Sequence, residues 1–308
     1  MTVIITGAGG LLGHSLAAEA RRAGHKVIAL GRAAKPPVGL ACDRWIAGDL
    51  ADPRARGCDW QVFPGAAVFH LAADTRIYEA GRDFARDNVA TTETACVIAQ
   101  RTSGRLVLFS SSAVYSGPRT HRPVASLAEG DETNPTTPYG RSKCAAEEAV
   151  RRAGVDAVVL RIFGVLSNRL PLMPERGNLI QAICRAWRTG SEVIVPLDRD
   201  GEPAVRDYVS DEDICRCALA SLTWTPPPTG PMVVNVCTGV ATTALEMVDA
   251  ARSLGERPLN VRVDSSSLVV NPVMLGDPSE LRRLHKSVPA DRVQEFWEQL
   301  LSGRGPAR

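Results

Sequence analysis

Short apolar runs alternate with longer amphipathic stretches through the first half of the chain. The apolar runs, which are rich in Val, Ile and Leu, predict strands at 3–6, 26–30, 45–47, 67–71, 106–110 and 157–161. Stretches with helical periodicity lie at 11–22, 84–100 and 139–153, while 51–65 predicts only a turn or a short helix. Because strands that alternate with helices and are apolar on both faces form parallel sheets, the pattern predicts an α/β fold.

The second half of the chain is less regular. A segment rich in Pro, Asn and Arg at 166–176 predicts a loop, and a Pro-rich tract lies at 225–231. The remaining predicted elements are helices at 179–189, 211–222, 244–254 and 291–301, strands at 193–195 and 232–236, and a disordered tail at 302–308. A smaller, mixed α/β region is therefore expected to follow the regular half.

Composition excludes several classes of protein. The chain has 308 residues, with 36 Lys+Arg against 34 Asp+Glu, so a protein that binds nucleic acid or a membrane surface through its charge is not expected. No apolar run reaches the length of a membrane span. Eight scattered cysteines without a C-x-x-C pair indicate free thiols in a reducing compartment, by default the cytoplasm. The five histidines lack metal-ligand spacing, so no metal is expected.

A glycine-rich loop joins the first predicted strand to the first predicted helix. It reads TGAGGLLG at 6–13, with glycines at Gly7, Gly10 and Gly13 and with Leu11 and Leu12 opening the helix. Such a loop lets the backbone approach a pyrophosphate, and the helix N-terminus supplies N–H groups to it. In this strand–loop–helix context the loop predicts dinucleotide binding and a doubly wound Rossmann sheet.

The residues after the next two strands bear on the cofactor. A carboxylate at the end of the second strand would bind the adenosine ribose, whereas an arginine there can accommodate a 2′-phosphate. The sequence has Arg32 and no acid at that point, which favours NADP over NAD, although Arg32 can also be read as a solvated surface residue. Asp49 and Leu50 follow the third strand, where Asp49 suits either an adenine contact or a plain turn.

Tyr139 and Lys143 begin the third long helix, one turn apart on the same face. A free tyrosine loses its proton near pH 10, and a neighbouring ammonium favours the phenolate and lowers that pKa. The pair can then exchange a proton with a substrate hydroxyl while hydride moves to or from the cofactor. With only four tyrosines and four lysines in the chain, chance explains this pair poorly.

A strand runs upstream into the hydroxyl-rich turn SSSAVY at 110–115. A hydroxyl at the carboxyl edge of the sheet can polarise a carbonyl or hold a substrate alcohol beside Tyr139. Serines that only cap a turn are the alternative reading of this motif on its own.

These motifs together carry a family resemblance. The chain resembles the extended short-chain dehydrogenases/reductases, the NAD-dependent epimerase/dehydratase group that acts largely on nucleotide sugars. The matching motifs run in the family's order: TGAGGLLG at 6–13, GDL at 48–50, HLAA at 70–73, NV at 88–89 with a threonine at 91, SSSAVY at 110–115, PYGRSK at 138–143, LRIFG at 160–164, RDYV at 206–209 and NVCTG at 235–239.

The resemblance implies roles for these residues. Ser111 matches the catalytic Ser/Thr, with Ser112 as a fallback that would contact substrate, and Tyr139 and Lys143 match the catalytic pair, whose lysine also contacts the nicotinamide ribose. The residues that match positions along the cofactor are Leu71, Ala72, Ala73 and Asn88. Arg206 matches an arginine that often holds a substrate's phosphates, although an exposed arginine without a ligand would look the same.

Two departures from the family pattern narrow the chemistry. Dehydratases of the family place an Asp-Glu pair after the catalytic hydroxyl, where this chain has Ser112 and Ala113, and no cysteine lies in this turn to support deprotonation beside a carbonyl. The usual substrate-contacting asparagine is replaced by Gly164, followed by an altered turn at 166–168. The first departure disfavours water elimination, and the second leaves room for a smaller or unusual substrate.

The sequence therefore predicts an NAD(P)-dependent oxidoreductase or epimerase, a 4-epimerase or 4-ketoreductase and not a dehydratase. Its expected substrate is a hydroxyl or ketone of a nucleotide-linked sugar. The alternatives are an NADPH-dependent reductase of a non-nucleotide ketone and a non-catalytic NAD(P)-binding regulator. The expected domains are a dinucleotide-binding domain at 1–165 with returning segments at 205–240, and a substrate-binding region at 166–204 and 241–308. A homodimer is expected through the helix with Ala145, Ala146, Ala149 and Val150, although core packing explains the same residues.

Overall fold

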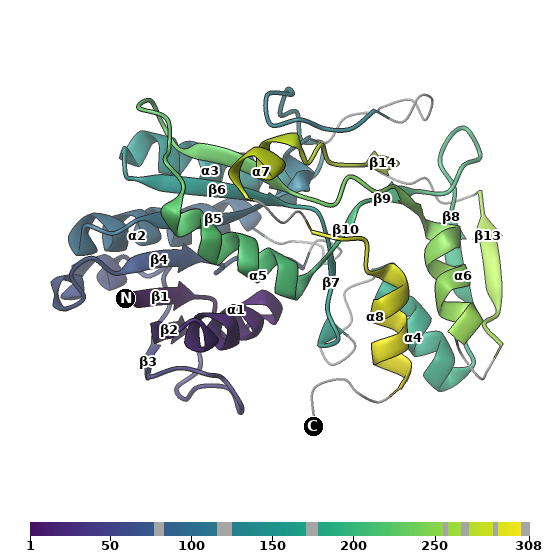
Figure 1. The fold of residues 1–308 in the computed structure, drawn as a ribbon, viewed down its shortest axis with the longest axis horizontal. Coiled ribbons are helices and arrows are strands. Elements are labelled where there is room, and N and C mark those ends of the chain that lie inside the picture. The colour runs from purple at the N-terminus through teal and green to yellow at the C-terminus, as the bar shows by residue number, and fades with distance from the viewer. Residues whose placement is uncertain are drawn as a thin grey trace.

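A seven-stranded parallel sheet forms the centre of the protein (Figure 1). The computed structural model describes residues 1–76, 83–115, 125–170, 178–254, 258–265, 271–285 and 289–302. The strands of the sheet are β1 (Thr2–Thr6), β2 (Lys26–Gly31), β3 (Arg44–Ala47), β4 (Ala67–His70), β5 (Leu106–Ser111), β6 (Ala157–Ile162) and β11 (Met232–Val236). Their order is β11-β6-β5-β4-β1-β2-β3, with every pair parallel. The predicted doubly wound Rossmann fold is confirmed.

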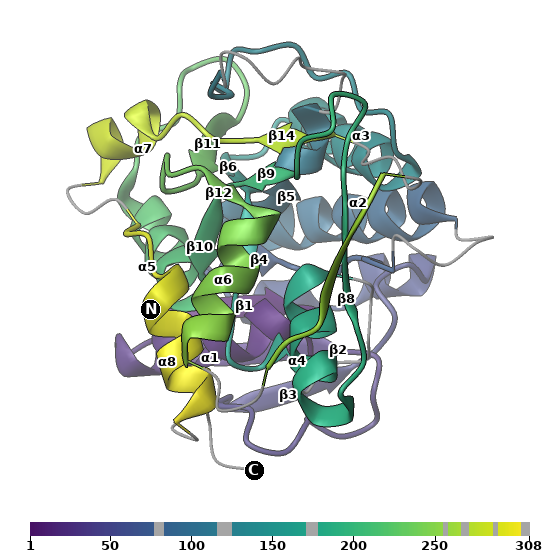
Figure 2. The same ribbon diagram turned by 90° about the vertical axis from the view of Figure 1, so that its right-hand side faces the viewer.

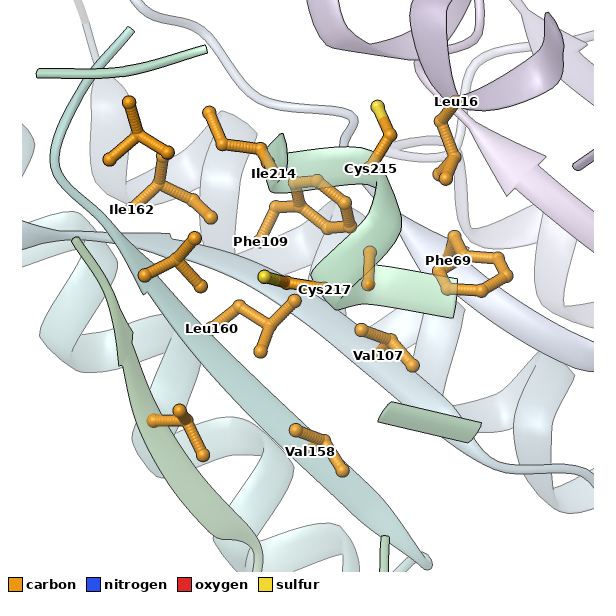
Figure 3. Close-up of a cluster of buried hydrophobic side chains, with 14 of the residues drawn as sticks. Leu16, Phe69, Val107, Phe109, Val158, Leu160, Ile162, Ile214, Cys215 and Cys217 are labelled. Carbon is orange, nitrogen blue, oxygen red and sulfur yellow. The ribbon is translucent and has the colours of Figure 1, made fainter. Parts of the chain in front are cut away.

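Helices cover both faces of this sheet. One face carries α1 (Leu11–Arg22) and α5 (Asp211–Ala220), and the other carries α2 (Phe84–Thr102) and α3 (Pro138–Ala153). Figure 3 shows Ile214 and Cys217 of α5 beside Phe109 and Leu160 of the sheet, with Cys215 turned toward Leu16 of α1. These strands are buried on both faces, which explains their nearly continuous apolar sequence.

Short 3-10 turns complete this half of the molecule. They are η1 (Pro53–Gly57), η2 (Trp60–Val62), η3 (Ser112–Tyr115) and η5 (Ser221–Thr223). The first two occupy the segment for which the sequence predicted only a turn or a short helix. Within the described part of the chain, no helix is long and apolar enough to cross a membrane.

A smaller region lies beyond the carboxyl ends of the strands (Figures 1 and 2). Its helices are α4 (Leu179–Thr189), α6 (Ala244–Leu254) and α8 (Val293–Leu301), whereas α7 (Ser279–Leu284) packs beside β11 of the central sheet. Three small sheets accompany them, and their strands are β7 (Gly164–Leu166) with β10 (Tyr208–Ser210), β8 (Val193–Pro196) with β13 (Val261–Asp264), and β9 (Val205–Arg206) between β12 (Thr242–Thr243) and β14 (Val273–Met274). The predicted helices of this region are present.

The sequence missed several short elements in the second half of the chain. Strands β7, β9, β10, β12 and β14 are two or three residues long and α7 has six residues, which is too short for hydrophobic periodicity to show. Leu166, the first residue of the loop predicted at 166–176, is the last residue of β7. Residues 171–176 of that loop lie outside the described residues. Residues 303–308 of the predicted disordered tail also lie outside them.

Candidate active site

The place expected for a dinucleotide is the point where the chain leaves β1 and β4. These strands are neighbours, but the chain continues from β1 toward β2 and from β4 toward β5, on opposite sides, and ligands of doubly wound sheets bind at this switch point. Gly7, directly after β1, has φ +65°. A Cβ there would lie 2.6 Å from the backbone nitrogen of Ala72. The glycine loop and the segment after β4 therefore meet so closely that only glycine fits.

The N-terminus of α1 is open to an anion. Gly10 is its N-cap residue and supplies no side-chain cap, and the first turn contains no acidic residue. Helices α3, α4 and α5 are instead capped by the side chains of Thr137, Asn178 and Ser210. The free N–H groups and the positive end of the helix dipole suit a pyrophosphate. The predicted loop residues Gly7, Gly10, Leu11, Leu12 and Gly13 all belong to this turn, so the structure fits a dinucleotide.

Arg32 is exposed directly after β2. The ring of Trp45 covers the preceding residue so closely that a Cβ on Gly31 would lie 2.4 Å from it. Asp49 accepts a hydrogen bond from the backbone N–H of Ala51 at 3.0 Å, as a turn-forming aspartate does. The Leu50 carbonyl accepts one from the Thr94 hydroxyl at 2.8 Å, which attaches this turn to α2.

His70, the last residue of β4, is buried and contacts two threonine hydroxyls. The ring nitrogens of His70 lie 2.8 Å from the Thr6 hydroxyl and 3.1 Å from the Thr92 hydroxyl. Burial, assisted by the charge of Lys143, lowers the pKa of His70 to about 3, so the imidazole stays neutral. Thr6 also accepts hydrogen bonds from the backbone N–H groups of Leu71 and Ala72. This chain of contacts fixes the predicted cofactor-side residues Leu71 and Ala72.

Asn88 links three parts of the site. Its amide donates to the Ser142 hydroxyl of α3 at 2.8 Å and accepts from the backbone N–H of Asp74 at 2.7 Å. Only 1% of its surface is exposed. Asn88 therefore joins α2 and α3 to the segment that contains Ala73, and the site owes part of its shape to this amide.

Strand β5 and helix α3 bring the predicted catalytic residues together. Thr137 caps α3 and Pro138 opens it, so Tyr139 and Lys143 occupy its first two turns. The Lys143 ammonium donates to the carbonyl oxygen of Phe109 at 2.9 Å. The Ser111 hydroxyl hydrogen-bonds to Tyr139. Ser111, rather than Ser112, is thus the serine at the tyrosine.

Burial shifts the pKa values of this pair in opposite directions. It raises the pKa of Tyr139 to about 12, against the smaller lowering effect of the Ser111 hydroxyl. The lowered pKa expected from the sequence is therefore not found, because burial outweighs the effect of neighbouring groups. Burial lowers the pKa of Lys143 to about 8, against the opposing effect of the Glu147 carboxylate. Each shift favours the uncharged form, as desolvation does. A tyrosine and a lysine with perturbed pKa values beside a cofactor crevice suit proton transfer.

A buried polar network behind the catalytic pair was not predicted. Glu147 on α3 forms an ion pair with Arg161 on β6 at 2.8 Å and accepts a hydrogen bond from the Ser110 hydroxyl. Arg161 also donates to the phenol oxygen of Tyr115 at 2.8 Å, and that phenol donates to Asn235 at 2.7 Å. Glu147 lies two helical turns after Tyr139, and this spacing was the signal available in the sequence.

Arg206 lies on β9, and a neighbouring segment at 271–272 connects it to the residues before α3. Its guanidinium donates to the carbonyl oxygen of Pro272 at 3.1 Å. The preceding Asn271 contacts the hydroxyl of Thr136 at 3.4 Å, just before α3. The buried Asp207, which the sequence did not single out, accepts hydrogen bonds from the backbone of Thr238 and Gly239. Asp207 therefore anchors the strand that carries Arg206.

Gly164 is tightly enclosed. It pairs with Tyr208 across β7 and β10, and a Cβ on it would lie 2.8 Å from both the Asp207 carbonyl oxygen and the Tyr208 ring. The structure leaves no space for the asparagine expected from the family pattern, and the Tyr208 ring fills that position.

Helix α3 packs mainly inside the protein on the side of its small residues. Ala146 and Val150 belong to the core between α2, α3 and the sheet, and Ala149 is also buried. Intramolecular packing, the alternative to a dimer interface, accounts for these three residues.

Known proteins with similar sequences and folds share these features. Residues 3–237 match the NAD dependent epimerase/dehydratase family. A dTDP-6-deoxy-L-talose 4-dehydrogenase (NAD(P)(+)) of Kitasatospora kifunensis is 31% identical over 80% of this chain and 77% of that protein. The dTDP-4-dehydrorhamnose reductase of Mycobacterium tuberculosis is 30% identical over 71% of this chain, and the match spans only 65% of the reductase.

Solved structures give the same fold. The structure of MoeE5 in complex with UDP-glucuronic acid and NAD is 25% identical, with a TM-score of 0.78 over 98% of each chain. The UDP-glucose-4-epimerase of Stenotrophomonas maltophila with bound NAD is 21% identical, with a TM-score of 0.84 over 98% of this chain and 97% of that one. The predicted enzyme family is confirmed: the chain belongs to the NAD-dependent epimerase/dehydratase family, a group of extended short-chain dehydrogenases/reductases that use a nicotinamide dinucleotide.

Proposed function

We propose that this protein is an NAD(P)-dependent epimerase or ketoreductase that acts at a hydroxyl or ketone carbon, C4 by expectation, of a nucleotide-linked sugar. The observation that carries the proposal is the meeting of Ser111, Tyr139 and Lys143 at the carboxyl edge of the sheet, the edge from which the glycine loop also leaves. Relatives named as reductases or epimerases of dTDP- and UDP-linked sugars support the substrate class.

Tyr139 is the general acid/base in this proposal. In reduction its phenol gives a proton to the developing alkoxide, and in oxidation its phenolate takes that proton back. Ser111, which hydrogen-bonds to the phenol, holds the reacting oxygen at the same point. The bound nicotinamide would supply or accept the hydride, and its oxidised form would add a positive charge that favours the phenolate.

Lys143 tunes Tyr139 and holds the cofactor ribose. The ammonium lies 5.8 Å from the centre of the Tyr139 ring, a distance at which a positive charge stabilises a phenolate. A pKa near 8 leaves most of this lysine protonated at neutral pH. Leu71, Ala72 and Ala73 would line the cofactor and Arg206 the substrate phosphates, with Ser112 beside the sugar.

Hydride chemistry is preferred to water elimination. Elimination needs an acid and a base after the catalytic hydroxyl, and this chain has Ser112 and Ala113 in that turn. The remaining choice lies between re-reduction with inversion and one-way ketone reduction. A cofactor that stays bound in its oxidised form would indicate epimerisation, whereas ready exchange would indicate reduction.

A second candidate is reduction of a ketone that carries no nucleotide. Tyr208 occupies the space of the family's substrate-contacting asparagine, which favours an unusual substrate. One relative, 30% identical over 62% of this chain, is named a 2-alkyl-3-oxoalkanoate reductase. Assays with NADPH against UDP- and dTDP-linked 4-ketosugars and against free β-ketoacids would separate these candidates.

NADP is proposed as the preferred cofactor, with Arg32 at the 2′-phosphate and Asp49 and Leu50 beside the adenine. Arg32 is exposed, and it has no hydrogen bond or ion pair with any residue in the described ranges. The division at 1–165 plus 205–240 and at 166–204 plus 241–308 is retained as the functional division. A cytoplasmic homodimer also remains a proposal.

The test is the substitution Tyr139→Phe, with Glu148→Gln, at the surface of the same helix, as its control. Removal of a general acid/base reduces turnover by about 10²–10⁴-fold, so Tyr139→Phe should lose at least about 100-fold in kcat with cofactor affinity retained. Glu148→Gln should stay within a few-fold of the wild type. Comparable turnover in Tyr139→Phe and wild type would refute the assignment, and any measurable turnover would eliminate the non-catalytic regulator.

A further inference from the structure

Three consecutive residues of β5 hold three residues of α3 that are spaced one helical turn apart. The Phe109 carbonyl accepts from Lys143, the Ser110 hydroxyl donates to Glu147, and the Ser111 hydroxyl bonds to Tyr139. Residues four apart share a helix face, so Tyr139, Lys143 and Glu147 form one row against the end of the strand. The third member of this row has no role in the proposed chemistry.

We propose that Glu147 is a positioning residue, which together with Arg161 holds the catalytic row in register and supplies the negative charge that keeps the buried Lys143 ammonium protonated. This inference rests on the proposed roles of Tyr139 and Lys143. It adds a residue on the side of the lysine that faces away from the tyrosine.

Burial makes the charge of Glu147 matter. The side chains of Glu147 and Arg161 are 13% and 7% exposed, and Lys143 is 5% exposed. In such surroundings charges are poorly screened, and removal of one partner leaves the others uncompensated. The carboxylate of Glu147 raises the pKa of Lys143 against the lowering by burial.

Arg161 fixes the orientation of the Glu147 carboxylate. It contacts both carboxylate oxygens, with Nη2 at 2.8 Å from Oε2 and Nε at 3.1 Å from Oε1. Its other amino group is fixed by Tyr115 and by the carbonyl oxygen of Glu129. A guanidinium held at both ends gives the carboxylate one orientation, in which Oε1 still accepts from Ser110.

The other ionisable groups near Lys143 do not replace this carboxylate. His70 on β4 is neutral because burial lowers its pKa to about 3. Tyr115 on η3 is neutral because burial raises its pKa to about 12. Tyr139 on α3 is neutral until it transfers its proton. Cys144, the next residue of α3, is an uncharged thiol whose pKa is raised by burial and by Glu147 itself.

Loss of the Glu147 carboxylate is expected to lower the pKa of Lys143. Removal of a negative charge lowers the proton affinity of every neighbouring group. In Glu147→Gln the Lys143 ammonium therefore loses its proton at a lower pH, and the lysine–tyrosine pair as a whole binds protons less tightly. A purely structural role for Glu147 would lower stability without moving this titration.

The scarcity of lysine permits a direct measurement. Protein labelled with [ε-¹³C]lysine contains four labelled residues, Lys26, Lys35, Lys143 and Lys286, and Lys143→Met assigns the Lys143 signal. NMR titration should place the Lys143 midpoint near pH 8 in the wild type, and about one pH unit or more lower in Glu147→Gln. Glu148→Gln is the matched control, because Glu148 is the next residue and pairs with Arg151 at the surface; its Lys143 midpoint should equal that of the wild type.

If Glu147→Gln does not fold, Glu147→Gln/Arg161→Gln removes both charges of the pair. Its Lys143 midpoint should still be lowered, by less than in Glu147→Gln, because Glu147 lies one helical turn from Lys143 and acts on it directly, whereas Arg161 lies beyond Glu147. An unchanged midpoint in the folded variant would overturn the inference. The readout needs no substrate. A lowered midpoint combined with no turnover on any ketosugar would support the role of Glu147 and count against the proposed function instead.

Discussion

The ammonium nitrogen of Lys143 lies 5.8 Å from the centre of the Tyr139 ring, and both residues project from the first two turns of α3 toward the end of β5. The lysine is deeply buried, and its contact with the Phe109 carbonyl replaces only part of the water that it loses. The protein therefore keeps a costly charge where proton transfer is proposed. Buried charges that cost stability in this way are typical of functional sites.

Lys143→Met is expected to stabilise the protein at neutral pH. The pKa of Lys143 falls from 10.5 to about 8 on folding, so below pH 8 both states hold the proton and the buried ammonium costs up to about 3 kcal/mol. Loss of the hydrogen bond to Phe109 offsets about 1 kcal/mol. Urea unfolding at pH 7 should show a net gain of about 1–2 kcal/mol.

The pH dependence gives this prediction its control. Between pH 8 and 10.5 the unfolded chain binds the Lys143 proton and the folded protein does not, so wild-type stability rises through this window relative to Lys143→Met. Lys26→Met, at the exposed start of β2, should show no such difference. A stability difference between Lys143→Met and wild type that is constant from pH 7 to 10 would contradict the prediction.

The sequence could predict the catalytic pair because both residues lie in one helix. Helical spacing alone places Tyr139 and Lys143 on one face, and the strand that precedes Ser111 brings it to the carboxyl edge of the sheet. The Glu147–Arg161 pair joins residues from different elements. Local periodicity carries no information about such partners, so only the fold reveals them.

A histidine offers a second test of burial. His70→Gln should remove a source of acid instability, because the unfolded chain binds this proton near pH 6.5 whereas the folded protein binds it only near pH 3. Wild-type stability should therefore fall as the pH drops from 7, by about 2 kcal/mol at pH 5 from this residue alone.

Urea unfolding of wild type and His70→Gln at pH 7 and pH 5 measures this contribution as a difference. Contributions of other groups cancel between the two proteins. His285→Gln, at the less buried C-cap position of α7, is the matched control and should parallel the wild type. Parallel pH dependence in His70→Gln and wild type would show that the folded protein tolerates a charged imidazole at position 70.

Gly164→Asn, which restores the family's usual residue, is expected to destabilise the protein. The new Cβ would lie 2.8 Å from the Asp207 carbonyl oxygen, and backbone cannot move aside as a flexible side chain can. Overpacking of this kind costs about 1–3 kcal/mol, measurable by urea unfolding. Gly130→Ala, with no atom within 4 Å of its new Cβ, should have little effect. Wild-type stability in Gly164→Asn would mean that β7 and β10 separate readily.

The paired strands at Gly164 also show why the substrate region was hard to predict. β7 and β10 have three residues each. Gly164 pairs with Tyr208, which lies 44 residues later in the sequence. Segments this short give no alternation of polar and apolar residues. The family pattern correctly marked position 164 as unusual, but the reason, a tyrosine ring in that space, depends on the distant strand.

Arg32→Asp should reverse the cofactor preference. A carboxylate at this position can bind the ribose hydroxyls of NADH and repels a 2′-phosphate, whereas the arginine attracts that phosphate. Charge-assisted hydrogen bonds contribute about 1.5–3 kcal/mol, so the ratio of kcat/KM for NADPH over NADH should fall by at least about 10-fold. Arg44→Asp is the control, because Arg44 begins β3 beside Ile28, before the carboxyl edge, and its cofactor ratio should stay unchanged.

Arg32 is exposed, and it has no hydrogen bond or ion pair with the described residues that its replacement would disrupt. A ratio that does not change in Arg32→Asp would therefore place the 2′-phosphate elsewhere or assign the enzyme to NAD.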